Sequence, residues 1–96
     1  MTELKIVATI VVKEKFKQDV LKAFHNVVDG TRQEEGNVSY ELHEDTTNPL
    51  KYIILEVWKS DKAIDLHNES AHFNEFKNAI DGKVDSLSID IIRKVY

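Results

Sequence analysis

The clearest candidate for proton chemistry in this sequence is an acidic residue within an apolar segment. Glu56 lies in KYIILEVW, on the same predicted strand face as Ile54 and Trp58. A carboxyl group among apolar neighbours has a raised pKa, which suits a general acid or base. The alternative is that Glu56 pairs with a basic group or a backbone donor and only satisfies a polar position.

Two histidines follow this segment, His67 and His72, with the sequence Asn68–Ser70 between them. Their spacing is wrong for one continuous helix face, but a break in the helix would turn both toward one cavity. Histidine titrates near neutral pH and is therefore suited to shuttle protons. Two histidines with a carboxylate are also a possible metal triad. Without a cysteine or an HxxxH pair, we expect no metal; a simpler alternative is that His72 bonds backbone groups at a helix start.

Several side chains near these groups are candidates for binding a substrate. Trp58 offers a flat wall for an aromatic ring, or else it belongs to the core with its N–H bonded. His43, on the preceding strand, lines the same cavity or lies at the solvent edge. The predicted substrate-binding residues are Trp58, His43, Tyr52, Ile54 and Phe73.

The elements that must position these residues follow from periodicity and capping. β-branched and alternating apolar residues predict strands over residues 4–12, 37–45, 51–58 and 86–96. Helical spacing predicts a helix over 15–35 that ends at Gly36, and Gly30 within it should cost about 1 kcal/mol relative to alanine. Ser60 and Ser70 are placed to cap helices over 61–68 and 71–81, and Gly82 ends the second one.

The order β-α-β-β-α-β, with the second α split in two, predicts an α+β protein with a ferredoxin-like antiparallel sheet and helices on one face. The length of 96 residues fits a single domain over 1–96. A net charge of −4 argues against a nucleic-acid partner. The absence of cysteine, of a signal peptide and of a membrane-spanning segment favours a cytoplasmic protein with no membrane partner.

The predicted strands are apolar on both faces. The third strand has Ile53 and Leu55 on one side and Ile54 and Trp58 on the other. Helices can cover only one face, and a bare apolar sheet is rarely tolerated by a monomer. We therefore expect a homodimer in which two sheets face each other. A monomer that uses its second face to bind lipid or a ligand is the alternative.

The segment from Glu35 to Phe76 resembles the antibiotic-biosynthesis-monooxygenase domain, including quinol monooxygenases. A Glu-Gly turn leads into a strand, E-x-W follows, then a histidine, then S/T-x-H-F. The matching residues are Glu35, Gly36, Glu56, Trp58, His67, Ser70, His72 and Phe73. The anthrone-oxidising members have an asparagine where Ile54 stands here.

The resemblance implies a dimeric α+β barrel that oxygenates a small quinol-like or phenolic aromatic substrate without metal, flavin or another cofactor. It implies that His67 or His72 is the base, with Glu56 as its partner and Trp58 as a stacking wall. A relative that processes the phosphorylated autoinducer-2 signal leaves an isomerase-like role open, with Arg32, Lys59 and Arg93 as candidate cations. A binding or stress protein without catalysis is the third alternative.

Overall fold

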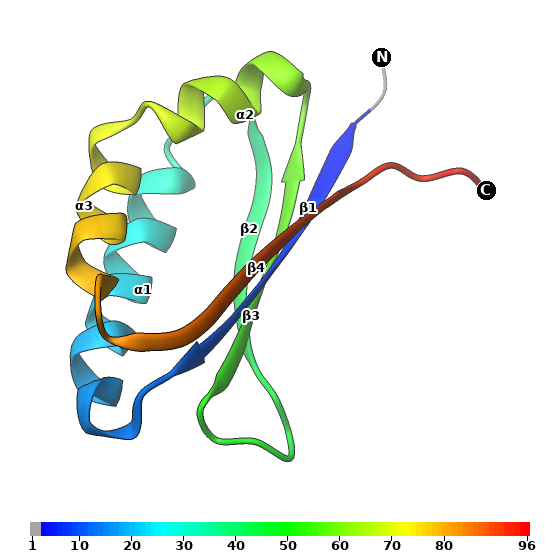
Figure 1. Cartoon of the computed structure of the whole chain (residues 1–96). Coiled ribbons are helices and arrows are strands. Elements are labelled where there is room, and N and C mark those ends of the chain that lie inside the picture. Colours follow the sequence, from blue (N-terminus) through cyan, green and yellow to red (C-terminus); the bar gives the residue numbers. More distant parts are fainter. Residues whose placement is uncertain (1–2) are drawn as a thin grey trace.

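The computed structural model describes residues 3–96 and has the predicted α+β architecture, with the helices on one side of a four-stranded sheet (Figure 1). The strand order is β2-β3-β1-β4, and each neighbouring pair is antiparallel. The ferredoxin-like prediction is therefore confirmed. The elements are β1 (Leu4–Val12), a 3-10 turn (Glu14–Phe16), α1 (Lys17–Thr31), β2 (Asn37–Glu44), β3 (Lys51–Trp58), α2 (Asp61–Asn68), α3 (Ala71–Ile80) and β4 (Val84–Ile92).

The capping predictions for the second half of the chain are confirmed. Ser60 accepts the backbone N–H of Ala63 at 3.1 Å, and Ser70 accepts that of Phe73 at 3.2 Å. Each hydroxyl satisfies a helix N–H that has no partner within the helix. Gly82 adopts the left-handed conformation (φ 75°) directly after α3, as a helix-ending glycine does.

The first helix is shorter than predicted, and Gly36 does not end it. α1 stops at Thr31, and Gly36 lies beyond a turn without a left-handed backbone. A Cβ at Gly36 would lie 2.4 Å from the Cβ of Ala63 in α2. The glycine is thus needed because the chain entering β2 passes directly against α2.

Two strands also differ from the prediction. β4 begins at Val84 and ends at Ile92, so the last four residues continue past the sheet. In β2 the register shifts between Asn37 and Ser39, which leaves Val38 half exposed. Strand alternation fails there because a bulge inserts an extra residue. The side-chain amide of Asn37 donates to carbonyls of both β2 and β3 and holds the irregular pairing.

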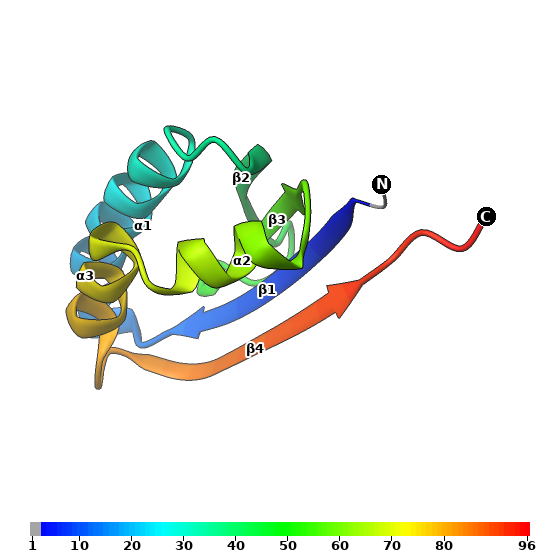
Figure 2. The ribbon, with the colours of Figure 1, turned by 90° about the horizontal axis from the view of Figure 1, so that it is seen from above.

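The core lies between the sheet and the helices, but it does not extend under all of β4. Strand residues with even numbers in β1 and β3 face the helices and are buried, among them Ile10, Ile54 and Trp58. The β4 residues opposite them face the same way, yet Leu87 is 47% and Ile89 is 51% exposed. Figure 2 shows the reason: β4 runs along the sheet edge farthest from α1, and its later part extends past the helices.

Gly30 in α1 makes room for α3. A Cβ at this position would lie 2.7 Å from the Cγ and 2.9 Å from the Cβ of His72. These atoms are close to the α3 backbone, so they cannot move away cheaply. The helix propensity that glycine gives up, about 1 kcal/mol, is therefore offset by close packing of the two helices.

We expect Gly30→Ala to lower the free energy of unfolding by about 1–3 kcal/mol, although alanine is the better helix former. Urea denaturation measures the change. The penalty should be smaller in a His72→Ala background, where part of the clash is gone. A stabilised Gly30→Ala protein would contradict this packing.

Candidate functional site

Glu56 is buried on the helix-facing side of β3. Its cross-strand partners are Ile6 in β1 and Tyr40 in β2, and the residue is 6% exposed. The indole N–H of Trp58 donates to Oε1 of Glu56 at 2.9 Å. Burial raises the pKa of Glu56 to about 7, and the nearby Glu34 also raises it, whereas the bond from Trp58 acts in the opposite direction. The carboxyl group therefore changes its charge near neutral pH.

Trp58 holds this carboxyl group from within the core. Its side chain is completely buried, and its ring packs against that of His67 at 4.7 Å between centroids and edge-on against Tyr40 at 6.4 Å. This is the core position with a bonded N–H, one of the two alternatives predicted for Trp58. Because the ring does not line the cavity described next, its contribution is to orient Glu56.

A cavity of about 440 Å³ lies between the sheet and helices α2 and α3. This volume is within the range of about 300–1,000 Å³ that is typical of small-molecule sites. Most of its lining is aliphatic or aromatic. Of the predicted site residues, Glu56, Ile54 and Phe73 line it. The cavity thus places an ionisable carboxyl group against apolar walls.

Tyr40 also lines this cavity and was not among the predicted site residues. It faces Glu56 across the β2–β3 pair. Burial raises the pKa of Tyr40 well above its usual range, and the carboxylates of Glu56 and Glu34 raise it further, whereas the side chain of Thr31 acts in the opposite direction. The phenol therefore keeps its proton and remains a hydrogen-bond donor. The sequence signal for Tyr40 was strand alternation, which puts it on the face of β2 that lies beside Glu56.

Tyr52 and His43 do not reach the cavity. Tyr52 faces the helices but lies four residues along β3 from Glu56, roughly 13 Å away, and packs against Phe24 of α1. His43 is exposed on the opposite side of the sheet, where Nδ1 bonds the carbonyl of Glu41 at 3.1 Å. Since strand side chains alternate, His43 cannot share a face with Tyr40.

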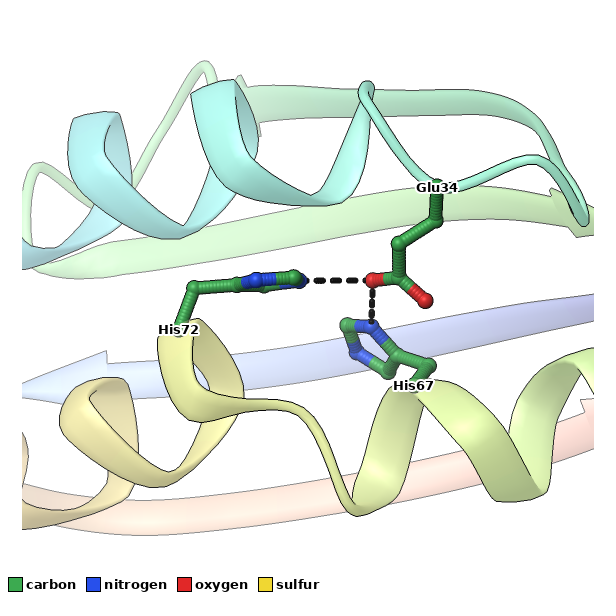
Figure 3. A group of neighbouring side chains, drawn as sticks. All are labelled: Glu34, His67 and His72. Carbon is green, nitrogen blue, oxygen red and sulfur yellow. Dashed lines mark hydrogen bonds and ion pairs between the residues drawn. The ribbon is translucent and has the colours of Figure 1, made fainter.

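The two predicted histidines meet at one oxygen of Glu34, as Figure 3 shows. Nδ1 of His67 lies 2.7 Å from Oε2 of Glu34, and Nε2 of His72 lies 2.6 Å from the same atom. Glu56 bonds Trp58 instead, so the predicted pairing of a histidine with Glu56 is replaced by pairing with Glu34. Neither histidine lines the 440 Å³ cavity.

Glu34 was missed because the sequence places two glutamates before Gly36. The motif pointed to Glu35, which is exposed. Glu34 is the one that turns inward, because the chain leaves α1 after Thr31 and crosses toward α2. Only the packing of that turn decides which carboxylate faces the histidines.

The break between α2 and α3 brings the histidine rings together despite their spacing. The Ser70 hydroxyl donates to the carbonyl of His67 at 2.7 Å while it caps α3. The two ring centroids are then 6.0 Å apart. The break does bring both side chains together, but they meet at Glu34 and not at the predicted cavity.

His67 is the more enclosed of the two histidines. It is 2% exposed, and its ring packs between those of Trp58 and Phe73, at 4.7 and 4.6 Å. Burial lowers the pKa of His67, although the bond to Glu34 opposes that change. Because the folded state disfavours the protonated ring, stability associated with His67 is present above its unfolded pKa and is lost as the pH falls.

The same three side chains are a possible ligand set for a metal. Nδ1 of His67, Nε2 of His72 and a carboxylate oxygen of Glu34 lie within 4.8 Å of one another. Two imidazoles and a carboxylate suit a divalent transition metal. The N–O separations of 2.6 and 2.7 Å are hydrogen-bond lengths, so an ion would have to replace both bonds.

The cations predicted for a phosphorylated ligand do not line the cavity. Nε of Arg32 donates to the carbonyl of Tyr40 at 3.1 Å, and Arg32 lines a different hollow beside α1. Lys59 and Arg93 are exposed and lie outside the cavity wall. In the part of the chain from residue 3 onward, no helix is long and apolar enough to cross a bilayer.

Fold and site together define an α+β protein with a buried acid at an apolar cavity, and comparison with known proteins identifies its family. The family model for antibiotic biosynthesis monooxygenase matches residues 4–79. "Putative monooxygenase YcnE" of Bacillus subtilis is 35% identical over 86 residues, which covers 90% of each chain. The chain belongs to the antibiotic biosynthesis monooxygenase family, and its general class is that of a monooxygenase-type protein.

Solved structures share the whole fold. A conserved protein from Methanosarcina mazei Go1 has a TM-score of 0.93 at 29% identity, covering 99% of this chain and 95% of its own. The "Putative antibiotic biosynthesis monooxygenase from Nitrosomonas europaea" has the same TM-score of 0.93 at 17% identity, covering 99% of this chain and 92% of its own. At that identity the second likeness shows the fold alone.

The Glu34–histidine cluster gives a prediction about stability. Glu34→Gln removes the charge that accepts both ring N–H groups, so we expect the free energy of unfolding to fall by about 1–3 kcal/mol. Urea denaturation at neutral pH measures the change. Glu35→Gln is the matched control, because the neighbouring carboxylate is exposed. Equal stability of the two variants would show that the cluster contributes nothing.

Proposed function

We propose that this protein is a cofactor-independent monooxygenase that oxidises a small quinol-like or phenolic aromatic substrate. One observation carries the proposal: a buried carboxyl group, Glu56, with a pKa raised to about 7, forms part of the wall of an otherwise largely apolar cavity. Such a group can take a proton from a weak acid in a site that excludes most water. Membership of the monooxygenase family supports the same class of reaction.

In the proposed reaction, Glu56 accepts the proton of a substrate hydroxyl group. Tyr40, which keeps its own proton, donates a hydrogen bond to the oxygen anion that forms. The electron-rich anion then reduces dioxygen: a ring C–H becomes C–O, and the second oxygen atom leaves as water. The net change is phenol plus O2 to quinone plus water, so the substrate supplies all the electrons.

His67 and His72, predicted as bases, enter this proposal as positioning residues. Both rings are held by Glu34, and the ring of His67 packs on Trp58 and Phe73. Trp58 orients Glu56, and Phe73 forms part of the cavity wall. The cluster therefore supports two residues of the site, Trp58 and Phe73, although its own side chains do not line the cavity.

The proposal predicts that Glu56→Gln abolishes turnover. The amide of this variant cannot accept a proton as the carboxylate does, so we expect dioxygen uptake with menadiol to fall by at least about 100-fold. The wild-type rate should rise with pH through about 7, because the base must be ionised to act. Oxygen-electrode traces, corrected for the rate in buffer, measure both effects.

Glu14→Gln is the matched control, because Glu14 is an exposed glutamate in the 3-10 turn, outside the cavity wall. Wild-type uptake no faster than buffer with every quinol tried would refute the oxygenase. Stabilisation by such ligands without turnover would favour the binding-protein alternative.

We also propose that the working form is a homodimer. The side of the sheet away from the helices has no cover within residues 3–96, and Leu55 on it is 42% exposed. On the helix-facing side, the β4 residues Leu87, Ile89 and Ile91 are also half exposed. At about 25 cal/mol per Å², covering this apolar surface with a second copy would be strongly favourable.

Sedimentation at micromolar concentration should therefore detect a dimer. Ile91→Asp places a charge on the bare part of β4 outside the cavity wall, so we expect it to shift the equilibrium toward the monomer. Leu66→Asp is the control, since Leu66 is equally exposed but lies on α2. A monomeric wild-type protein would overturn the dimer.

A further inference from the structure

A lysine lies on the wall of the cavity that contains Glu56. Lys77, on α3, is exposed, which places it at the mouth, whereas Glu56 is almost completely buried. Nζ of Lys77 lies 5.5 Å from the centroid of the Phe73 ring, which lines the same cavity. The lysine stem therefore follows the cavity wall, with its ammonium group held beside an aromatic face.

This ammonium group has no anionic partner within residues 3–96. Lysine ion pairs in this part of the chain join Lys51 to Asp45 and Lys83 to Asp19. A lysine beside an aromatic ring, without a carboxylate, leaves its charge available to a ligand.

The rest of the cavity wall restricts what this cation can recognise. Among the described lining residues, Lys77 is the only cation, and Glu56 is the only carboxyl group. Asn68 adds an exposed amide, and the remaining lining residues are apolar apart from Tyr40. A ligand that satisfies this wall has an apolar body, a hydroxyl group at one end for Glu56 and an anionic group at the other.

We propose that the substrate is an aromatic hydroxy acid whose carboxylate binds Lys77 while its phenolic hydroxyl group meets Glu56. This inference rests on the proposed function, because it assigns the substrate class of the same site. One lysine matches the single charge of a carboxylate. A phosphate monoester carries nearly two charges and would leave one without a cationic partner among the described lining residues.

Binding of three related probes tests the proposal. We expect 6-hydroxy-2-naphthoate to bind the wild-type protein about tenfold more tightly than its uncharged methyl ester and more tightly than 6-hydroxy-2-naphthyl phosphate, which keeps the hydroxyl group. In Lys77→Met, which keeps the apolar stem but loses the charge, the acid and the ester should bind equally. Isothermal titration calorimetry measures all three, and the preference should weaken at high salt.

Lys62→Met is the matched control, because Lys62 is an exposed lysine on α2 outside the cavity wall. It should keep the wild-type preference, and melting curves of both variants check that they fold. Equal binding of acid and ester to the wild-type protein overturns the inference, as does a preference that survives in Lys77→Met. Tighter binding of the phosphate also overturns it.

The two proposals fail separately. Oxygen uptake with menadiol, which has phenolic hydroxyl groups but no carboxylate, tests the oxygenase without the lysine. Uptake without a preference for the acid refutes only the substrate class. A preference for the acid that depends on Lys77, with no uptake for any quinol or hydroxy acid, refutes the oxygenase and leaves an aromatic-acid binding site.

Discussion

The site depends on the burial of one carboxyl group in an apolar layer. Glu56 occupies a core position on β3, where burial penalises its charge, and Trp58 from the same strand donates the bond that partly offsets this penalty. Two residues apart on a strand, the pair shares one face whatever the rest of the fold does. The strand therefore sets the position of the acid and its bond to Trp58, whereas burial beneath the rest of the fold raises its pKa.

A second network supports Trp58, although none of its own residues lines the cavity. Glu34 joins His67 of α2 to His72 of α3, and His67 packs directly on Trp58. Two glycines permit this: Gly30 admits His72 against α1, and Gly36 lets the turn after Glu34 approach α2. Both glycines are explained by close approach rather than by a left-handed backbone.

Local rules predicted the features that local physics determines. Alternation placed Glu56 and Trp58 on one face, and hydroxyl caps located the starts of α2 and α3. The sequence did not indicate which of Glu34 and Glu35 turns inward. Nor did it show that the helices stop short of β4. Both depend on how elements distant in sequence pack, which periodicity does not encode.

The cavity and the exposed edge of the sheet share residues of β4. Leu87 and Ile89 line the cavity and are also half exposed, because no helix reaches over β4. A partner that covered this edge would change the water content of the cavity and therefore the environment that raises the pKa of Glu56. A partner on β4 would thus act on the chemistry through desolvation, without any contact with the acid itself.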